Sequence, residues 1–99
     1  MIRHIVLWRL KGENEIEKRE RGMQIKSALE ALNGKIPGLI FLKVGFDFSR
    51  TPDSSDIVLY SEFESKADVE AYQQHPEHLK VIPFVRENRT ERRMADCEV

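Results

Sequence analysis

Apolar residues are dense over residues 2–11 and predict a β-strand at the start of the chain. Successive side chains of a strand point to opposite faces, so its members divide into two sets. One face would carry Ile2, His4, Val6, Trp8 and Leu10. The other face would carry Arg3, Ile5, Leu7, Arg9 and Lys11. Both faces of this strand therefore include large apolar side chains.

Residues 13–32 predict a helix with acidic residues in its first turns and a late apolar stripe of Ile25, Leu29 and Leu32. Gly22 lies inside it and costs about 1 kcal/mol relative to alanine, so we expect the first half to be the weaker half. Asn33 and Gly34 predict the end of this helix, and a Pro–Gly turn follows at residues 37–38.

Two further strands are predicted over residues 39–48 and 57–64, separated by a polar loop over residues 49–56. In the first of them, one face would carry Ile40, Leu42, Val44, Phe46 and Phe48. Leu39 and Phe41 would lie on the other face, so this strand is also apolar on both sides.

Ser65, followed by Asp68, predicts the N-cap of a second helix. This helix should break near Pro76 and resume through residues 79–84, and Pro83 marks a second expected irregularity. A last short strand is predicted from about residue 92 to residue 98.

The predicted order is strand, helix, strand, strand, helix, strand. This order indicates an α+β, ferredoxin-like βαββαβ fold, with a four-stranded antiparallel sheet and two helices on one face. A chain of 99 residues fits a single domain over residues 1–99. Two helices cover only one face of a sheet, yet two strands are apolar on both faces. Because soluble monomers rarely expose such a patch, we expect a homodimer whose two sheets face each other.

Charge limits the classes of partner. Sixteen Lys and Arg residues against 17 Asp and Glu residues leave no global field that would attract nucleic acid or an anionic membrane. The basic stretch over residues 86–93 is interrupted by Glu87 and Glu91, and we interpret it as a solvated, salt-paired segment. We therefore expect neither nucleic acid nor membrane as a partner.

Cysteine usage and the N-terminal residues indicate the compartment. The one cysteine, Cys97, forms no intramolecular disulfide and fits a reducing environment, where we expect an inert thiol. No signal peptide is predicted, because only four apolar residues separate His4 from Arg9. No segment approaches the roughly 20 apolar residues that span a bilayer. We expect a cytoplasmic protein.

The segment over residues 71–78 holds most of the candidate chemistry. On an unbroken helix, Tyr72 and His78 would point about 120° apart. Pro76 should stop the helix near Gln74 and start a new one at its own position, which brings His78 into the first turn of the new helix. A helix N-terminus favours a neutral imidazole, as a general base requires. Tyr72 could orient that base or donate to a carbonyl oxygen that gains charge.

Each of these side chains also has a purely structural interpretation. His78 could be an ordinary helix histidine, Tyr72 could belong to the core, and His4 could be a buried, hydrogen-bonded residue of the first strand. His75 could cap the helix that follows it. A metal site formed by His75 and His78 with Glu77 or His4 is disfavoured, because the proline break separates the two histidines. We predict no metal and no cofactor.

The chain resembles the stress-responsive α/β-barrel domain family, also called dimeric α/β-barrel proteins. Four segments carry the resemblance in order, namely residues 3–11, 36–38, 61–65 and 72–78. The resemblance implies a ferredoxin-like subunit that dimerises sheet to sheet into a barrel. One plant branch, of the olivetolic acid cyclase type, closes a linear polyketide by aldol condensation without a cofactor. The resemblance to that branch implies Tyr72 and His78 as catalytic positions and His4 as a pocket residue. Ser27 and Ile57 depart from it, since they stand where a tyrosine and a histidine are expected.

Three hypotheses for the function follow. The first is a homodimeric protein that binds a small, apolar, carbonyl-containing molecule between helices and sheet, with His4, Trp8 and His75 as substrate-binding candidates. The second is a cofactor-independent, polyketide cyclase-like lyase with His78 as general base and Tyr72 as its catalytic partner. The third is a non-enzymatic protective stress protein. The residues alone do not decide whether the protein is an enzyme.

Overall fold

Four strands form one antiparallel sheet in the order β2-β3-β1-β4 in the computed structural model, which describes residues 1–99. The strands are β1 (Ile2–Leu10), β2 (Leu39–Phe46), β3 (Ile57–Phe63) and β4 (Arg89–Glu98), and the helices are α1 (Glu15–Glu30), α2 (Lys66–Gln74) and α3 (Pro76–Asn88). This is the predicted α+β, ferredoxin-like order, with its second helix divided into α2 and α3. The prediction of fold class is confirmed.

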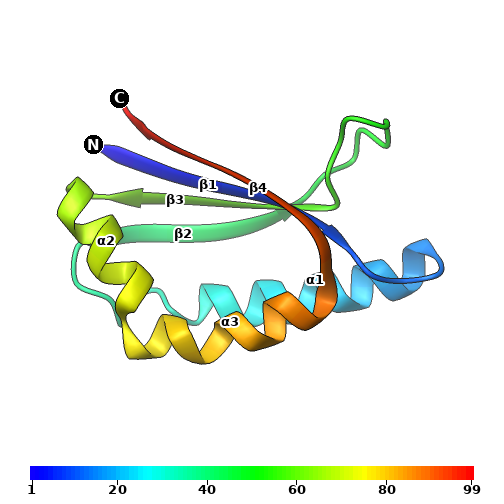
Figure 1. The fold of residues 1–99 in the computed structure, drawn as a ribbon, viewed down its shortest axis with the longest axis horizontal. Helices are drawn as coiled ribbons and strands as arrows, with labels where there is room; N and C mark the ends of the chain where they lie inside the picture. Colours follow the sequence, from blue (N-terminus) through cyan, green and yellow to red (C-terminus); the bar gives the residue numbers. More distant parts are fainter.

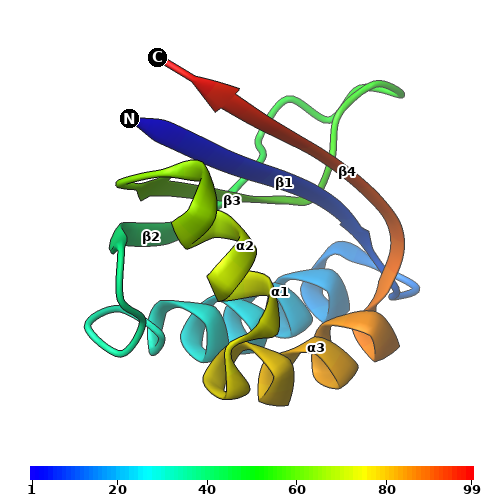
Figure 2. The ribbon, with the colours of Figure 1, turned by 60° about the vertical axis from the view of Figure 1, so that its left-hand side comes forward.

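All three helices lie on one face of the sheet and leave the other face uncovered (Figures 1 and 2). Strands β1 and β3 bury every second residue against the helices, as an antiparallel sheet covered on one side does. The core lies between the two layers and includes Leu42, Ile57 and Phe63, which are fully buried. None of the three helices has the length and apolar character to cross a bilayer.

Strand β2 differs from its prediction at both ends. The register against β3 shifts between Leu39 and Phe41, so Leu39 packs against the core and Ile40 is displaced to an exposed position. The prediction extended this strand to Phe48, on the same face as Leu42 and Val44, and this was wrong. The strand ends at Phe46, and Phe48 lies in the loop with 90% of its surface exposed.

Gly22 has a packing role that its helix propensity does not indicate. A Cβ atom at this position would lie 2.7 Å from Cε1 of Phe46 and 3.2 Å from Cγ2 of Ile57. Helix α1 therefore approaches the sheet more closely here than any side chain would allow. The glycine is a point of tight contact between helix and sheet.

The break at Pro76 occurs as predicted. Ser65 caps α2 by accepting from the backbone N–H of Asp68, and α2 ends at Gln74. His75 is extended, with φ −67° and ψ 133°, and Pro76 opens α3. The expected second irregularity at Pro83 was wrong, because α3 continues through it to Asn88. Pro83 is exposed, so water can replace the N–H that it withholds from the preceding turn.

Asn88 fixes the junction from which β4 begins. Its side-chain amide donates to the carbonyl of Phe84, and its Oδ1 accepts from Arg21 at 2.6 Å. Its own carbonyl accepts from the N–H of Lys11. Strand β4 starts directly after this anchor at Arg89, three residues earlier than predicted, and runs beside β1 to the C-terminal end.

Candidate ligand-binding site

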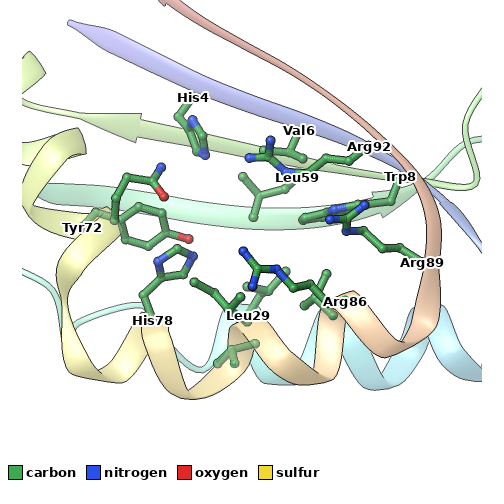
Figure 3. A pocket seen from close by; sticks show the side chains of 14 residues that line it. His4, Val6, Trp8, Leu29, Leu59, Tyr72, His78, Arg86, Arg89 and Arg92 are labelled. Atoms are coloured by element: carbon green, nitrogen blue, oxygen red, sulfur yellow. The ribbon is translucent and has the colours of Figure 1, made fainter.

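A cavity of about 280 Å³ lies between the inner face of the sheet and helices α2 and α3 (Figure 3). Fourteen residues line it, eight of them hydrophobic. The hydrophobic ones are Val6, Trp8, Leu29, Leu59, Tyr72, Val81, Ile82 and Val85. The others are His4, Gln73, His78, Arg86, Arg89 and Arg92. The cavity therefore brings together Tyr72, His78, His4 and Trp8, four of the five residues predicted from the sequence.

The rings of Tyr72 and His78 stack, with their centroids 4.0 Å apart and their planes inclined by 23°. Two residues six positions apart could not meet in this way on a straight helix. The extended backbone of His75 and the restart at Pro76 turn the new helix so that its first turn faces the end of α2. The proline break thus creates this aromatic pair.

His78 favours the neutral imidazole. Burial in the cavity wall lowers the pKa of His78 from its ordinary value, and the electrostatic effects of Arg92 and of a protonated His4 act in the same direction. The backbone carbonyls of Tyr72 and Gln73 oppose this pKa shift, although neither forms a hydrogen bond with Nδ1 of His78. The sequence predicted a neutral ring from the helix dipole, whereas burial is the largest cause in the structure.

The hydroxyl of Tyr72 points into the cavity (Figure 3). Burial raises the pKa of Tyr72, so the phenol keeps its proton at physiological pH. The Tyr72 hydroxyl forms no hydrogen bond within the chain. A protonated phenol at this place can donate a hydrogen bond to a ligand oxygen.

His4 is held by a residue that the sequence analysis missed. Strand β4 pairs His4 with Asp96, and Nδ1 of His4 hydrogen-bonds to Oδ1 of Asp96. An ionised carboxylate only accepts, so this bond assigns the proton of the neutral ring to Nδ1 and leaves Nε2 as the acceptor. The ring is 3% exposed and packs edge-on against Tyr72 and Phe63. Asp96 could not be found from spacing, because 92 residues separate it from its partner.

Of the other two substrate-binding candidates, Trp8 lies in the cavity wall and His75 lies outside it. Trp8 lines the cavity and is 5% exposed, and its indole Nε1 has no hydrogen-bond partner. His75 does not line the cavity. Its Nδ1 accepts from the backbone N–H of Glu77 at 3.1 Å and caps α3. The structure therefore gives His75 the capping role that was its structural interpretation.

Three arginines complete the cavity wall. Arg86 and Arg92 are exposed, as the interpretation of a solvated basic stretch expected. The salt-paired part of that interpretation was wrong for Arg86, Arg89 and Arg92, which line the cavity and form no ion pair. Only Arg93 of this stretch pairs with an acid, Glu91, which also pairs with Arg9 on β1. The physical reason is the alternation of β4, which turns Arg92 inward and Arg93 outward.

The positions that depart from the cyclase branch lie outside the cavity. Ser27 is exposed on α1, and Ile57 is fully buried in the core. No group of three or more His, Cys, Asp or Glu side chains is arranged to hold a metal ion. The chemistry available at the cavity is that of two histidines, a phenol, an indole N–H, an amide and three guanidinium groups.

Comparisons with known proteins agree with this fold. A dimeric protein of unknown function with a ferredoxin-like fold from Bacteroides fragilis is 34% identical, with a TM-score of 0.83 over 99% of this chain and 95% of that chain. A Dabb family protein from Mesorhizobium loti is 22% identical, with a TM-score of 0.76 over 99% and 95% of the two chains. A hydroxynitrile lyase from Passiflora edulis is 20% identical, with a TM-score of 0.81 over 99% and 92%.

No functionally curated protein matches the sequence. Residues 2–99 match the family described as the stress responsive A/B barrel domain, Dabb. The match covers almost the whole chain and includes every residue of the cavity wall. The chain belongs to the stress responsive A/B barrel domain family.

Proposed function

We propose that this protein binds a small carbonyl-containing molecule in the cavity between helices and sheet. The observation that carries the proposal is the convergence of Tyr72, His78 and His4 on one cavity that also holds an unpaired indole N–H. Buried polar groups in folded proteins are seldom left without partners. A ligand oxygen would supply the missing acceptor.

The apolar and the polar residues of the cavity wall would contact different parts of the ligand. The hydrophobic residues would contact its carbon skeleton, and the Tyr72 hydroxyl would donate to its carbonyl oxygen. His78 stacks directly on Tyr72, so its ring would lie beside the same carbonyl group. A volume of about 280 Å³ is just below the roughly 300 Å³ at which pockets for drug-sized ligands begin. The ligand would therefore be small.

A cofactor-independent lyase or cyclase is the second candidate, and the protonation states of the cavity favour it. A neutral His78 could remove a proton from the carbon next to a carbonyl, while Tyr72 stabilises the enolate oxygen that forms. His4, oriented by Asp96, offers a second basic nitrogen. The hydroxynitrile lyase from Passiflora edulis shares the fold, which makes lyase chemistry the first class to test.

We also propose a homodimer formed through the uncovered face of the sheet. The Bacteroides fragilis protein, 34% identical, is described as dimeric. On the uncovered face, Ile5, Leu7 and Val58 form an apolar centre. Polar groups flank this centre at both ends, an arrangement common in protein interfaces. One end has the hydrogen bonds that join Arg3, Tyr60 and Glu62, and the other has the ion pairs of Glu91 with Arg9 and Arg93.

The function can be tested with acetophenone, a small methyl ketone. Trp8 is the only tryptophan and lines the cavity, so its fluorescence reports binding. In D₂O, exchange of the methyl protons measured by NMR reports base catalysis. We expect acetophenone to change the Trp8 fluorescence of the wild-type protein. If the lyase candidate holds, exchange is accelerated by the 10²–10⁴-fold typical of a positioned base and is lost in His78→Gln.

Tyr72→Phe is the companion variant. It keeps the ring that stacks on His78 and removes a hydroxyl that has no partner in the chain, so stability should change by less than about 0.5 kcal/mol. Binding of acetophenone should weaken because the donor to its oxygen is gone. Binding without exchange would identify a binding protein, and exchange that depends on His78 would identify an enzyme. The absence of both effects would contradict the proposal and favour a protective role.

A further inference from the structure

The cavity has positive charge without an internal counterion. Arg86 comes from α3, Arg89 from the start of β4 and Arg92 from the inward face of β4. None of the three forms an ion pair, and the 14 lining residues include no aspartate or glutamate. Asp96 shares the inward face of β4 with Arg92, but it is hydrogen-bonded to His4.

Trp8 adds an independent observation. Its side chain is 5% exposed, lines the same cavity, and carries an Nε1–H without an acceptor. The indole nitrogen can only donate. Together, the guanidinium groups and the indole make this part of the cavity wall rich in donors and free of acidic acceptors.

Figure 3 shows how these groups are distributed. Arg86 and Arg92 extend from opposite walls toward the same space, with Trp8 and Arg89 at the end away from Tyr72 and His78. Guanidinium groups bind carboxylates with two parallel hydrogen bonds, which suits a planar carboxylate. A bare inorganic anion would leave the eight hydrophobic residues of the same wall without an apolar group of the ligand to contact. The walls therefore fit an anion with an apolar body.

We propose that the cavity selects small organic carboxylates, with Arg86, Arg89, Arg92 and the Trp8 indole N–H holding the carboxylate. This inference rests on the proposed function and names the class of its ligand. Arg86 and Arg92 reach the middle of the cavity, between Trp8 and the Tyr72–His78 pair, so a carboxylate on these donors leaves the rest of a small ligand beside Tyr72 and His78. An oxo acid, which has a carboxylate and a separate carbonyl group, matches both sets of polar groups.

Benzoate and benzamide provide the test, because they have nearly the same shape and differ in charge. We would titrate each into the 99-residue protein and follow Trp8 fluorescence together with the NMR signal of its indole N–H. Benzoate should bind at least about tenfold more tightly than benzamide, since hydrogen bonds to a charged group are the stronger ones. Benzoate should also shift the indole N–H signal by accepting its hydrogen bond.

Three variants assign the effect to the arginines. Arg92→Gln and Arg86→Gln should each weaken benzoate binding roughly tenfold and leave benzamide binding unchanged. Lys80→Gln is the matched control. It removes one positive charge from the exposed surface of α3, outside the cavity, and should leave both affinities unchanged.

The outcomes separate this inference from the function on which it rests. If benzamide binds as tightly as benzoate and the arginine variants change nothing, the preference for carboxylates is overturned while the pocket function stands. If inorganic phosphate binds as tightly as benzoate, the organic part of the proposal is overturned. If benzoate, benzamide and acetophenone all leave Trp8 unperturbed, both the inference and the proposed function fail.

Discussion

His4 and His78 line the same cavity, but the surrounding residues constrain them differently. His4 is fixed by its bond to Asp96 and by the edges of Tyr72 and Phe63. The ring of His78 stacks on that of Tyr72, and its Nδ1 is buried without a hydrogen-bond partner. The contacts of His4 set the orientation and tautomer of its ring, whereas the burial of His78 changes the proton affinity of its ring. His4 is therefore suited to hold a ligand in place, and His78 is suited to exchange a proton with it.

The proton affinity of His78 leads to a prediction about stability. Burial lowers its pKa in the folded protein below the ordinary value of 6.5, so the unfolded chain binds a proton here more readily. The stability that depends on the neutral ring is complete above about pH 6.5 and is lost as the pH falls through the lower, folded-state pKa. In His78→Gln, the free energy of unfolding should fall less between pH 7.5 and pH 5 than in the wild type. Urea unfolding at each pH measures this, and parallel falls in both proteins would contradict it.

At the scale of the elements, the site depends on one interrupted helix. Pro76 separates α2 from α3, and the change of direction at His75 sets the stacking of Tyr72 on His78. A continuous helix with the same side chains would direct the two rings to different faces. Helix α1 packs against another part of the sheet, where Gly22 lies against Phe46 of β2.

Gly22→Ala should destabilise the protein even though alanine is the better helix former. Its methyl group would lie 2.7 Å from Phe46, and overpacking of this kind costs about 1–3 kcal/mol, while the gain in helix propensity is at most about 1 kcal/mol. We expect a net loss of about 1 kcal/mol in the free energy of unfolding, measured by urea denaturation. Gln24→Ala, at an exposed position of the same helix, serves as the control. A gain in stability for Gly22→Ala would show that Phe46 moves aside freely.

Features with a local physical cause could be predicted from the sequence. The cap at Ser65, the break at Pro76 and the alternation of β1 each depend on a few neighbouring residues, and each is confirmed. The role of Gly22 depends on how closely α1 approaches the sheet, which no local pattern reveals.

The part of the site that could not be predicted depends on strand register. Whether Arg92 lines a cavity, and whether Asp96 meets His4, is set by the pairing of β4 with β1 from opposite ends of the chain. A shift of one residue would turn Arg93 inward in place of Arg92. The sequence shows the charges of this segment but not the face on which each one lies.

At the scale of the whole molecule, the uncovered sheet face is the largest feature that the cavity does not explain. Figure 1 shows the helices on one side of the sheet only. On the open side, Ile5, Leu7 and Val58 are half-buried within one chain. A second copy on this face would remove them from water, and the dimeric Bacteroides fragilis relative supports such an arrangement.

Leu7→Glu should therefore convert a dimer into a monomer. A buried glutamate at the centre of the interface would face its own copy, and the desolvation of two like charges opposes association. Light scattering should give about twice the 11.6 kDa chain mass for the wild-type protein and a single chain mass for the variant. Met23→Glu, on an exposed part of α1, controls for the added charge. A variant that keeps the dimer mass would place the interface elsewhere.

Strand β4 has a consequence for how binding and folding are connected. It is the edge of the sheet and pairs with β1 alone, yet it supplies both Arg92 and the carboxylate that orients His4. It is also the C-terminal strand, and terminal segments are among the parts of a protein that open locally at low free energy. Transient fraying of this strand would remove an anchoring charge and release His4 together, while most of the core stayed folded. A ligand bound to Arg92 would therefore stabilise the paired state of β4. Amide hydrogen exchange along β4 should be slower in the ligand-bound protein than in the free protein.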